Sequence, residues 1–278
     1  CFILTEDDRC PFLKSDGLCE LILTKGEDML CEICREHPRF YARYGDFYDM
    51  GEGLCCEEAA SLLFLNTSPL KLITEAESRD DTAYFDDGLI DPETLYMLRQ
   101  STLHTLCDRT QTLHDRIHSI FENLLLKQYG KINLAFPSED EFYDILIKAS
   151  KKTEAYDADF THLLKCLCEN KASALFSRKT FISYLGERTA DYEKLLSYLV
   201  FRHFPKAVYD GDALGKFCFC VGVTAITFYA DVLLFAERGK FDLADRINSV
   251  KYLSKQFEYS DENPEILSEE LKKRILRI

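Results

Sequence analysis

The stretch DALGKFCFCVGVTAITFYADVLLFAE, residues 212–237, decides the fold. Its central part, residues 217–235, is the most apolar run in the chain. Three polar residues interrupt it: Thr224, Thr227 and Asp231. A membrane-spanning helix needs about 18 apolar residues with few or no charges. We therefore expect a buried core helix that ends at Gly239.

Helical patterns occupy most of the chain on both sides of this stretch. Apolar residues recur at three-to-four spacing between Pro92 and Gly130, and this periodicity predicts one long amphipathic helix. Ser138 and Glu141 form a capping box, which marks the start of another helix. Further helices are expected over residues 57–65, 159–169 and 190–203, from 243 to 257, and after Ser268. Since the sequence shows no convincing alternating strands, the predicted fold class is mainly α: a loop-rich cysteine-cluster module followed by an all-α helical bundle.

The N-terminal end differs from the rest because it holds most of the cysteines. Seven of them fall early in the chain, at Cys1, Cys10, Cys19, Cys31, Cys34, Cys55 and Cys56. Glycine and proline turns punctuate this segment, and it has little apolar material to bury, so we expect it to need a metal in order to fold. We therefore divide the chain into a cysteine-rich metal- or iron–sulfur-binding module, residues 1–65, and an all-α helical domain, residues 66–278.

The net charge and the positions of the cysteines indicate which kinds of partner and which cellular compartment to expect. The formal net charge is −14. Nucleic-acid binding draws most of its affinity from Lys and Arg on phosphates, so we expect no nucleic-acid partner, and we expect no membrane partner. The remaining cysteines lie at apolar positions of predicted helices and are expected to be buried free thiols, which favours a reducing cytoplasm. They are Cys107, Cys166, Cys168, Cys218 and Cys220.

The N-terminal thiols carry the clearest chemistry. Cys31 and Cys34 form a C-x-x-C pair, a spacing that lets two thiolates converge on one metal or cluster. Four thiolates suit zinc or an iron–sulfur cluster, and spacing alone does not separate the two. Disulfides or reduced structural thiols remain an alternative. Cys55 and Cys56 are adjacent and cannot easily bind the same centre, so one of them is expected to be a packing thiol.

Four motifs contain these thiols. They are Cys10-Pro11-Phe12-Leu13, Asp16-Gly17-Leu18-Cys19, Leu30-Cys31-Glu32-Ile33-Cys34-Arg35-Glu36-His37-Pro38-Arg39 and Leu54-Cys55-Cys56-Glu57-Glu58-Ala59-Ala60. Together they resemble the flagellin lysine-N-methylase family, which shares its cysteine region with a wider group of zinc- or iron-chelating proteins. The resemblance continues in segments 192–196, 198–204, 207–212 and 252–263. It covers both ends of the chain, whereas residues 66–185 are similar only in their helical character.

The resemblance implies a cytoplasmic protein-lysine N-methyltransferase. Such an enzyme moves methyl groups from S-adenosylmethionine to lysine side chains of flagellin. The resemblance also implies an iron–sulfur cluster, of the [4Fe–4S] type, with zinc as the alternative metal. By motif match the ligands are Cys10, Cys19, Cys34 and Cys56, together with Cys31. The competing interpretation is a non-catalytic cysteine-cluster protein that binds a metal.

The sequence departs from the family pattern at two positions of the last motif. Glu57 stands where the family has proline, and Cys55 stands where the family has a small polar residue. Family members also carry a cysteine group upstream of anything in this sequence, and the chain does not begin with methionine. We therefore expect a segment to precede Cys1, whose own role stays open.

Methyl transfer to lysine requires a neutral amine, so a group that accepts or orients a proton is needed. The candidates lie in the family-like helical segments and are Arg202, His203, Tyr252 and Glu258. Ion pairing and packing are the alternative roles for each of them. No glycine-rich loop follows a strand, so the site of the methyl donor is left unassigned. His114 and His118 share a helix face without an H-E-x-x-H pattern, and a solvated face is expected there.

Overall fold

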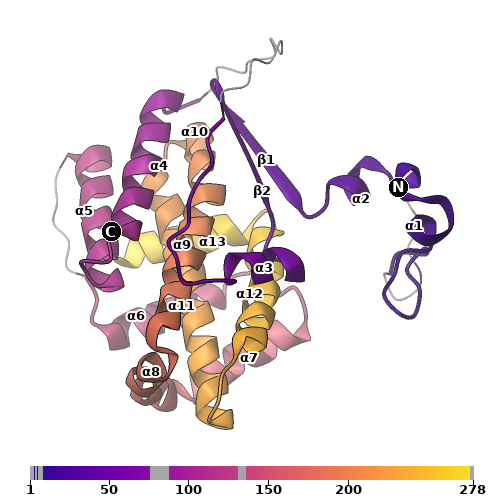
Figure 1. The fold of residues 1–278 in the computed structure, drawn as a ribbon. Coiled ribbons are helices and arrows are strands. Elements are labelled where there is room, and N and C mark those ends of the chain that lie inside the picture. Colours follow the sequence, from indigo (N-terminus) through magenta and orange to yellow (C-terminus); the bar gives the residue numbers. More distant parts are fainter. Residues whose placement is uncertain (1–2, 4, 6–8, 76–87, 131–135, 276–278) are drawn as a thin grey trace. The chain divides into compact units, whose positions relative to one another are not determined.

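The computed structural model describes residues 3, 5, 9–75, 88–130 and 136–275. Figure 1 shows its ribbon. Contacts divide the chain into two units, Cys1–Phe40 and Tyr41–Ile278. We call them the thiol unit and the helical unit and describe each by itself. The predicted module boundary after residue 65 stays a prediction.

The thiol unit consists of turns and short helices. α1 spans Glu20–Lys25, a 3-10 turn spans Glu27–Met29, and α2 spans Glu32–Glu36. None of the described residues of this unit is buried. Apolar burial, at about 25 cal/mol per Å² removed from water, therefore contributes little to its stability.

A β-hairpin follows in the sequence. β1, Arg39–Tyr44, pairs with β2, Phe47–Glu52, in a two-stranded sheet. The expectation that the chain lacks alternating strands is wrong here. The reason lies in β2, where Asp49 occupies a half-buried position while the apolar Tyr48 and Met50 are exposed. As a result, apolar and polar residues do not alternate along β2 in the way that a half-buried strand predicts.

The helical unit confirms the mainly α fold class. Its helices are α3 Glu57–Leu63, α4 Pro92–Cys107, α5 Leu113–Tyr129, α6 Glu139–Ser150, α7 Ala158–Glu169, α8 Lys171–Leu185, α9 Ala190–His203, α10 Ala207–Asp210, α11 Ala213–Arg238, α12 Leu243–Glu258 and α13 Asn263–Ile275. Two 3-10 turns, Gly186–Thr189 and Phe204–Lys206, flank α9.

α11 is the core of the helical unit, as its sequence predicts. It contacts α8, α9, α12 and α13, and Figure 1 shows it among these helices. By length and composition it is the helix in the described part of the chain that could cross a membrane, yet 72% of its most apolar window is buried inside the protein. Such burial is what a core helix requires. At Gly222 the contact with α13 is so close that a Cβ would lie 2.5 Å from Leu271 Cδ1.

Two helix predictions need correction. The expected helix from Pro92 to Gly130 is broken between α4 and α5. Asp108 bonds to the Thr110 N–H, and Thr112 caps α5 by accepting from the Asp115 N–H, so side chains take the place of helical backbone bonds at the break. The last helix begins at Asn263, before the expected start after Ser268.

Other boundaries agree with the sequence. The capping box of Ser138 and Glu141 opens α6, and Gly239, at φ 67°, ends α11 with a backbone bond to Phe235. Of the cysteines expected to be buried, Cys218 and Cys220 are, whereas the other three are only half-buried.

Candidate functional site

A tight turn brings Cys10 and Cys19 into one loop of the thiol unit. Leu13 pairs with Cys19 in an isolated antiparallel bridge, and the Lys14 N–H donates to the Leu18 carbonyl at 2.9 Å. Gly17 supports the reversal with φ 83°, a conformation that glycine adopts without strain. The backbone thus closes the loop between the two cysteines without any help from a core.

Cys31 and Cys34 form the closest pair of thiols. Cys31 lies at the N-cap of α2 and Cys34 within that helix, so one helical turn sets their sulfurs 3.5 Å apart. The backbone N–H and the thiol of Cys34 lower the pKa of Cys31. The pKa of Cys34 is raised, by its bond to Cys31, by burial and by the negative charges of Cys31, Cys10 and Cys19. These four thiols therefore interact electrostatically within one unit.

The donor chemistry of these four residues fits a thiolate-bound metal centre. Two sulfurs bound to one tetrahedral zinc, with Zn–S bonds of about 2.3 Å, lie about 3.8 Å apart, close to the spacing of the pair in α2. Among the described residues, however, no three His, Cys, Asp or Glu side chains meet as a complete metal site. The fifth predicted ligand, Cys56, begins α3 in the helical unit and stays a prediction.

Three of the four predicted catalytic residues meet in the interior of the helical unit. Glu258 Oε2 lies 3.1 Å from Arg202 Nη1 and 2.9 Å from His203 Nε2, and it accepts from the Tyr198 hydroxyl at 3.2 Å. We call these residues the Glu258 network. Tyr252 lies elsewhere, donating to Asp157 at 2.7 Å.

Burial controls protonation in the Glu258 network. Burial alone would raise the pKa of Glu258, but the charge of Arg202 and the bond from His203 bring it below its ordinary value. Burial lowers the pKa of His203 to about 4, although the bond to Glu258 opposes this shift. Near neutral pH the network therefore holds a carboxylate, a guanidinium and a neutral imidazole.

The Glu258 network also holds the segment that carries the cysteine pair. The Leu54 N–H donates to the Tyr198 hydroxyl at 3.3 Å, and Tyr198 in turn accepts from Arg202 at 2.8 Å. The Cys55 sulfur lies 3.0 Å from the Tyr259 hydroxyl, and Arg202 stacks 5.0 Å from the centre of the Tyr259 ring. Cys55 therefore has a defined anchor next to the predicted ligand that follows it.

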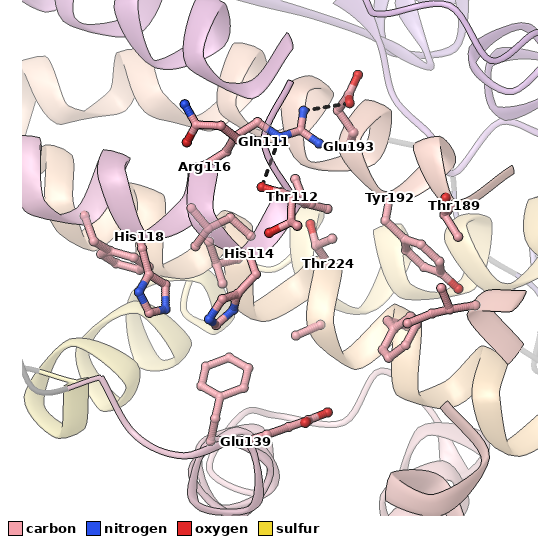
Figure 2. A pocket seen from close by; sticks show the side chains of 18 of the residues that line it. Gln111, Thr112, His114, Arg116, His118, Glu139, Thr189, Tyr192, Glu193 and Thr224 are labelled. Carbon is pink, nitrogen blue, oxygen red and sulfur yellow. Dashed lines mark hydrogen bonds and ion pairs between the residues drawn. The ribbon is translucent and has the colours of Figure 1, made fainter. Parts of the chain in front are cut away.

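A cavity of about 930 Å³ opens in another part of the helical unit. It is formed by the α4–α5 connection together with α5, α6, α8, α9 and α11. Most of its wall is apolar, including Phe121, Phe142, Ala225 and Phe228. Figure 2 shows the Arg116–Glu193 pair and Glu139 on opposite sides of the open space. Its volume is within the usual range of ligand-binding sites.

Every carboxylate on the described wall of the cavity has an arginine partner. Glu193 is bound by Arg109, at 2.8 Å, and by the buried Arg116, also at 2.8 Å. Glu139 pairs with Arg178. The charged side chains that line the cavity, Arg109, Arg116, Glu139 and Glu193, therefore sum to zero.

The histidine pair was expected on a solvated face, and this is only half correct. His114 is exposed, but His118 is half-buried, lines the cavity and stacks on Phe136 with ring centroids 3.7 Å apart. Burial, followed by the neighbouring His114, lowers the pKa of His118. The sequence holds no local signal for the cavity itself, because its wall is assembled from helices far apart in the chain.

Comparison with protein-family models finds a match to a large part of the chain. A family model described as the FliB lysine N-methylase C-terminal domain matches residues 95–277. No curated protein and no solved structure matches the chain. The matched range contains the whole described wall of the cavity and all four predicted catalytic residues.

Proposed function

The chain belongs to the FliB lysine N-methylase family, and from this premise we propose that it methylates lysine side chains of flagellin in the cytoplasm, with S-adenosylmethionine as the donor. In this reaction a neutral lysine nitrogen attacks the methyl carbon of the sulfonium. The S–CH₃ bond breaks as the N–CH₃ bond forms, and the sulfur keeps the bonding electron pair. The product ammonium then loses a proton to water. The family match to residues 95–277 is the observation that carries this proposal.

We further propose that Cys10, Cys19, Cys31 and Cys34 of the thiol unit hold an iron–sulfur cluster. If three of these cysteines bound a [4Fe–4S] cluster, its fourth iron would be open to the amino and carboxylate groups of the donor. The 3.5 Å spacing of Cys31 and Cys34 supports zinc as the alternative, because two ligands of a single ion lie closer together than ligands of two different irons. Metal analysis and absorption spectra of anaerobically purified protein separate the two.

For Arg202, His203 and Glu258 we propose a positioning role. Glu258 has a side chain only 1% exposed and already lies beside a guanidinium, so it is poorly placed to take a proton from a lysine of another protein. The Glu258 network instead reaches Leu54 through Tyr198, and Arg202 stacks on Tyr259, which anchors Cys55. It thereby orients the backbone just before Cys56. Tyr252 remains a candidate without a contact to this network.

The flagellin of cells that lack this gene tests the function. We expect its methyl-lysine to disappear in mass spectra and to return when the gene is restored. Methylation that is unchanged by the deletion would refute the enzymatic role and favour a metal-binding protein without catalytic activity.

A further inference from the structure

The cavity of the helical unit is suited to removing charge from a group that enters it. Its wall is largely aromatic and aliphatic, with Phe121, Phe142 and Phe228 contributed by three different helices. An amine moved from water into such surroundings loses the hydration that stabilises its protonated form. Apolar walls alone would therefore favour the neutral amine.

The charged groups on the wall do not compensate for this loss of hydration. Both wall carboxylates are already bound by arginines, Glu193 by two of them and Glu139 by one. An ammonium ion in the cavity would find no free carboxylate on the described wall, whose charged side chains Arg109, Arg116, Glu139 and Glu193 sum to zero. The wall therefore offers a protonated amine no opposite charge that would offset the cost of desolvation.

We propose that this cavity receives the acceptor lysine and holds it as the neutral amine. This inference rests on the proposed function, because it assigns the substrate side chain of that reaction to a place in the structure. The four-carbon stem of lysine packs against the apolar wall formed by Ala225 and Phe228 of α11 and by Phe142 of α6. The lysine leaves its proton in the solvent on entry, and methyl transfer gives the product as an ammonium, which water hydrates once it leaves the cavity.

α11 provides a matched pair of substitutions for the test. Ala225 is half-buried and lines the cavity, whereas Ala236 is exposed on the same helix and does not. Ala225→Leu fills the space with three extra carbons, and Ala236→Leu makes the same chemical change outside it. Ala190→Leu, at another lining position on α9, is the substitute if Ala225→Leu fails to fold.

The decisive experiment maps where a flagellin lysine lies on the protein. Flagellin that carries a photo-reactive diazirine lysine is irradiated with the full chain, and cross-linked peptides are located by mass spectrometry. We expect cross-links to the cavity-facing residues of α5, α6 and α11. Ala225→Leu should abolish them and raise KM for flagellin about tenfold, while Ala236→Leu leaves both unchanged.

The possible outcomes distinguish a failure of the proposed lysine site from a failure of the proposed function. Cross-links that fall outside the cavity, or that survive both filling substitutions, would overturn the site while methylation of flagellin still supports the function. Cross-links inside the cavity without any methyl transfer would support the lysine site and contradict the proposed enzyme activity.

Discussion

The thiol unit and the helical unit are stabilised by different kinds of interaction. No described residue of the thiol unit is buried, and its turns are closed by backbone hydrogen bonds around four mutually interacting thiols. In the helical unit, α9 is buried almost from end to end and α11 over most of its length. A segment without a core needs a cross-link such as a bound metal, whereas a packed bundle does not.

The helical unit also differs from the thiol unit in that it contains buried ion pairs. Glu193 and Glu258 are each placed against arginine in the interior, and both of these carboxylates are essentially inaccessible. Such groups depend on their partners much more than exposed pairs do. The two units should therefore respond to different substitutions.

The largest effect is expected in the thiol unit. Replacing both Cys31 and Cys34 by serine, or removing the metal with a chelator, should eliminate the amide-exchange protection of residues 10–36, because metal binding to thiolates contributes on the order of 10 kcal/mol to folding. The melting temperature of the helical unit should stay the same. Cys166→Ser, at a half-buried position of α7, is the control. Protection that survives the loss of both thiols would show that the thiol unit folds without a ligand.

The next largest effect is expected at Glu258. Glu258→Gln removes the charge that compensates Arg202 and should reduce the free energy of unfolding by about 3 kcal/mol. Urea denaturation measures this loss. Glu269→Gln, in an exposed pair with Lys273 at 2.9 Å, should cost less than about 0.5 kcal/mol. Equal effects at the two positions would contradict the distinction between buried and exposed charges.

Acid should destabilise the helical unit through His203. Its pKa of about 4 in the folded protein lies below the ordinary value of about 6.5. The unfolded chain therefore binds the proton first as the pH falls. The stability that comes from the neutral imidazole is fully present above about pH 6.5 and is lost down to about pH 4, to a total of about 3 kcal/mol.

His203→Gln isolates this contribution. The pKa of Glu258 is lowered and adds to acid sensitivity, whereas the pKa of Asp231, raised to about 6, opposes it. Both groups remain in the variant, so the difference in slope between the two proteins reports on His203. Parallel curves of unfolding free energy against pH would rule out a buried neutral imidazole.

The smallest effect tests how tightly α11 packs. Gly222→Ala places a methyl group against Leu271 and should cost about 1–3 kcal/mol by overpacking. The double variant with Leu271→Ala should show a favourable coupling energy, since the shorter side chain makes room for the methyl group. Additive losses in a double-mutant cycle would mean that α11 and α13 are not in close contact at this point.

Much of the fold could be predicted because its signals are local. The capping box at Ser138 and the apolar stretch of α11 are both readable over a few turns of helix. The hairpin has no such signal, because Asp49 points inward to Arg99, at 3.1 Å, and breaks the alternation of apolar and polar residues. The break between α4 and α5 depends on side-chain caps that an apolar pattern does not register.

The candidate sites differ in the same way: residues in recognisable local motifs can be predicted from the sequence, and residues joined by long-range contacts cannot. Arg202, His203 and Glu258 are candidates on sequence grounds. Tyr198, which links them to Leu54, has no such signal, because its role depends on a contact across 144 positions. The cavity could not be predicted from the sequence, since its wall is formed by residues of helices that lie far apart in the chain. Only the folded chain brings Glu193 and Glu139 to one space.

The central claim is that this chain transfers methyl groups to flagellin lysines. The most direct measurement incubates anaerobically purified protein with unmethylated flagellin and S-adenosylmethionine that carries a deuterated methyl group, followed by mass spectrometry of the lysine peptides. We predict labelled methyl-lysine that depends on both protein and donor. Flagellin that stays unlabelled, with a protein that is folded and loaded with its metal, would contradict the claim.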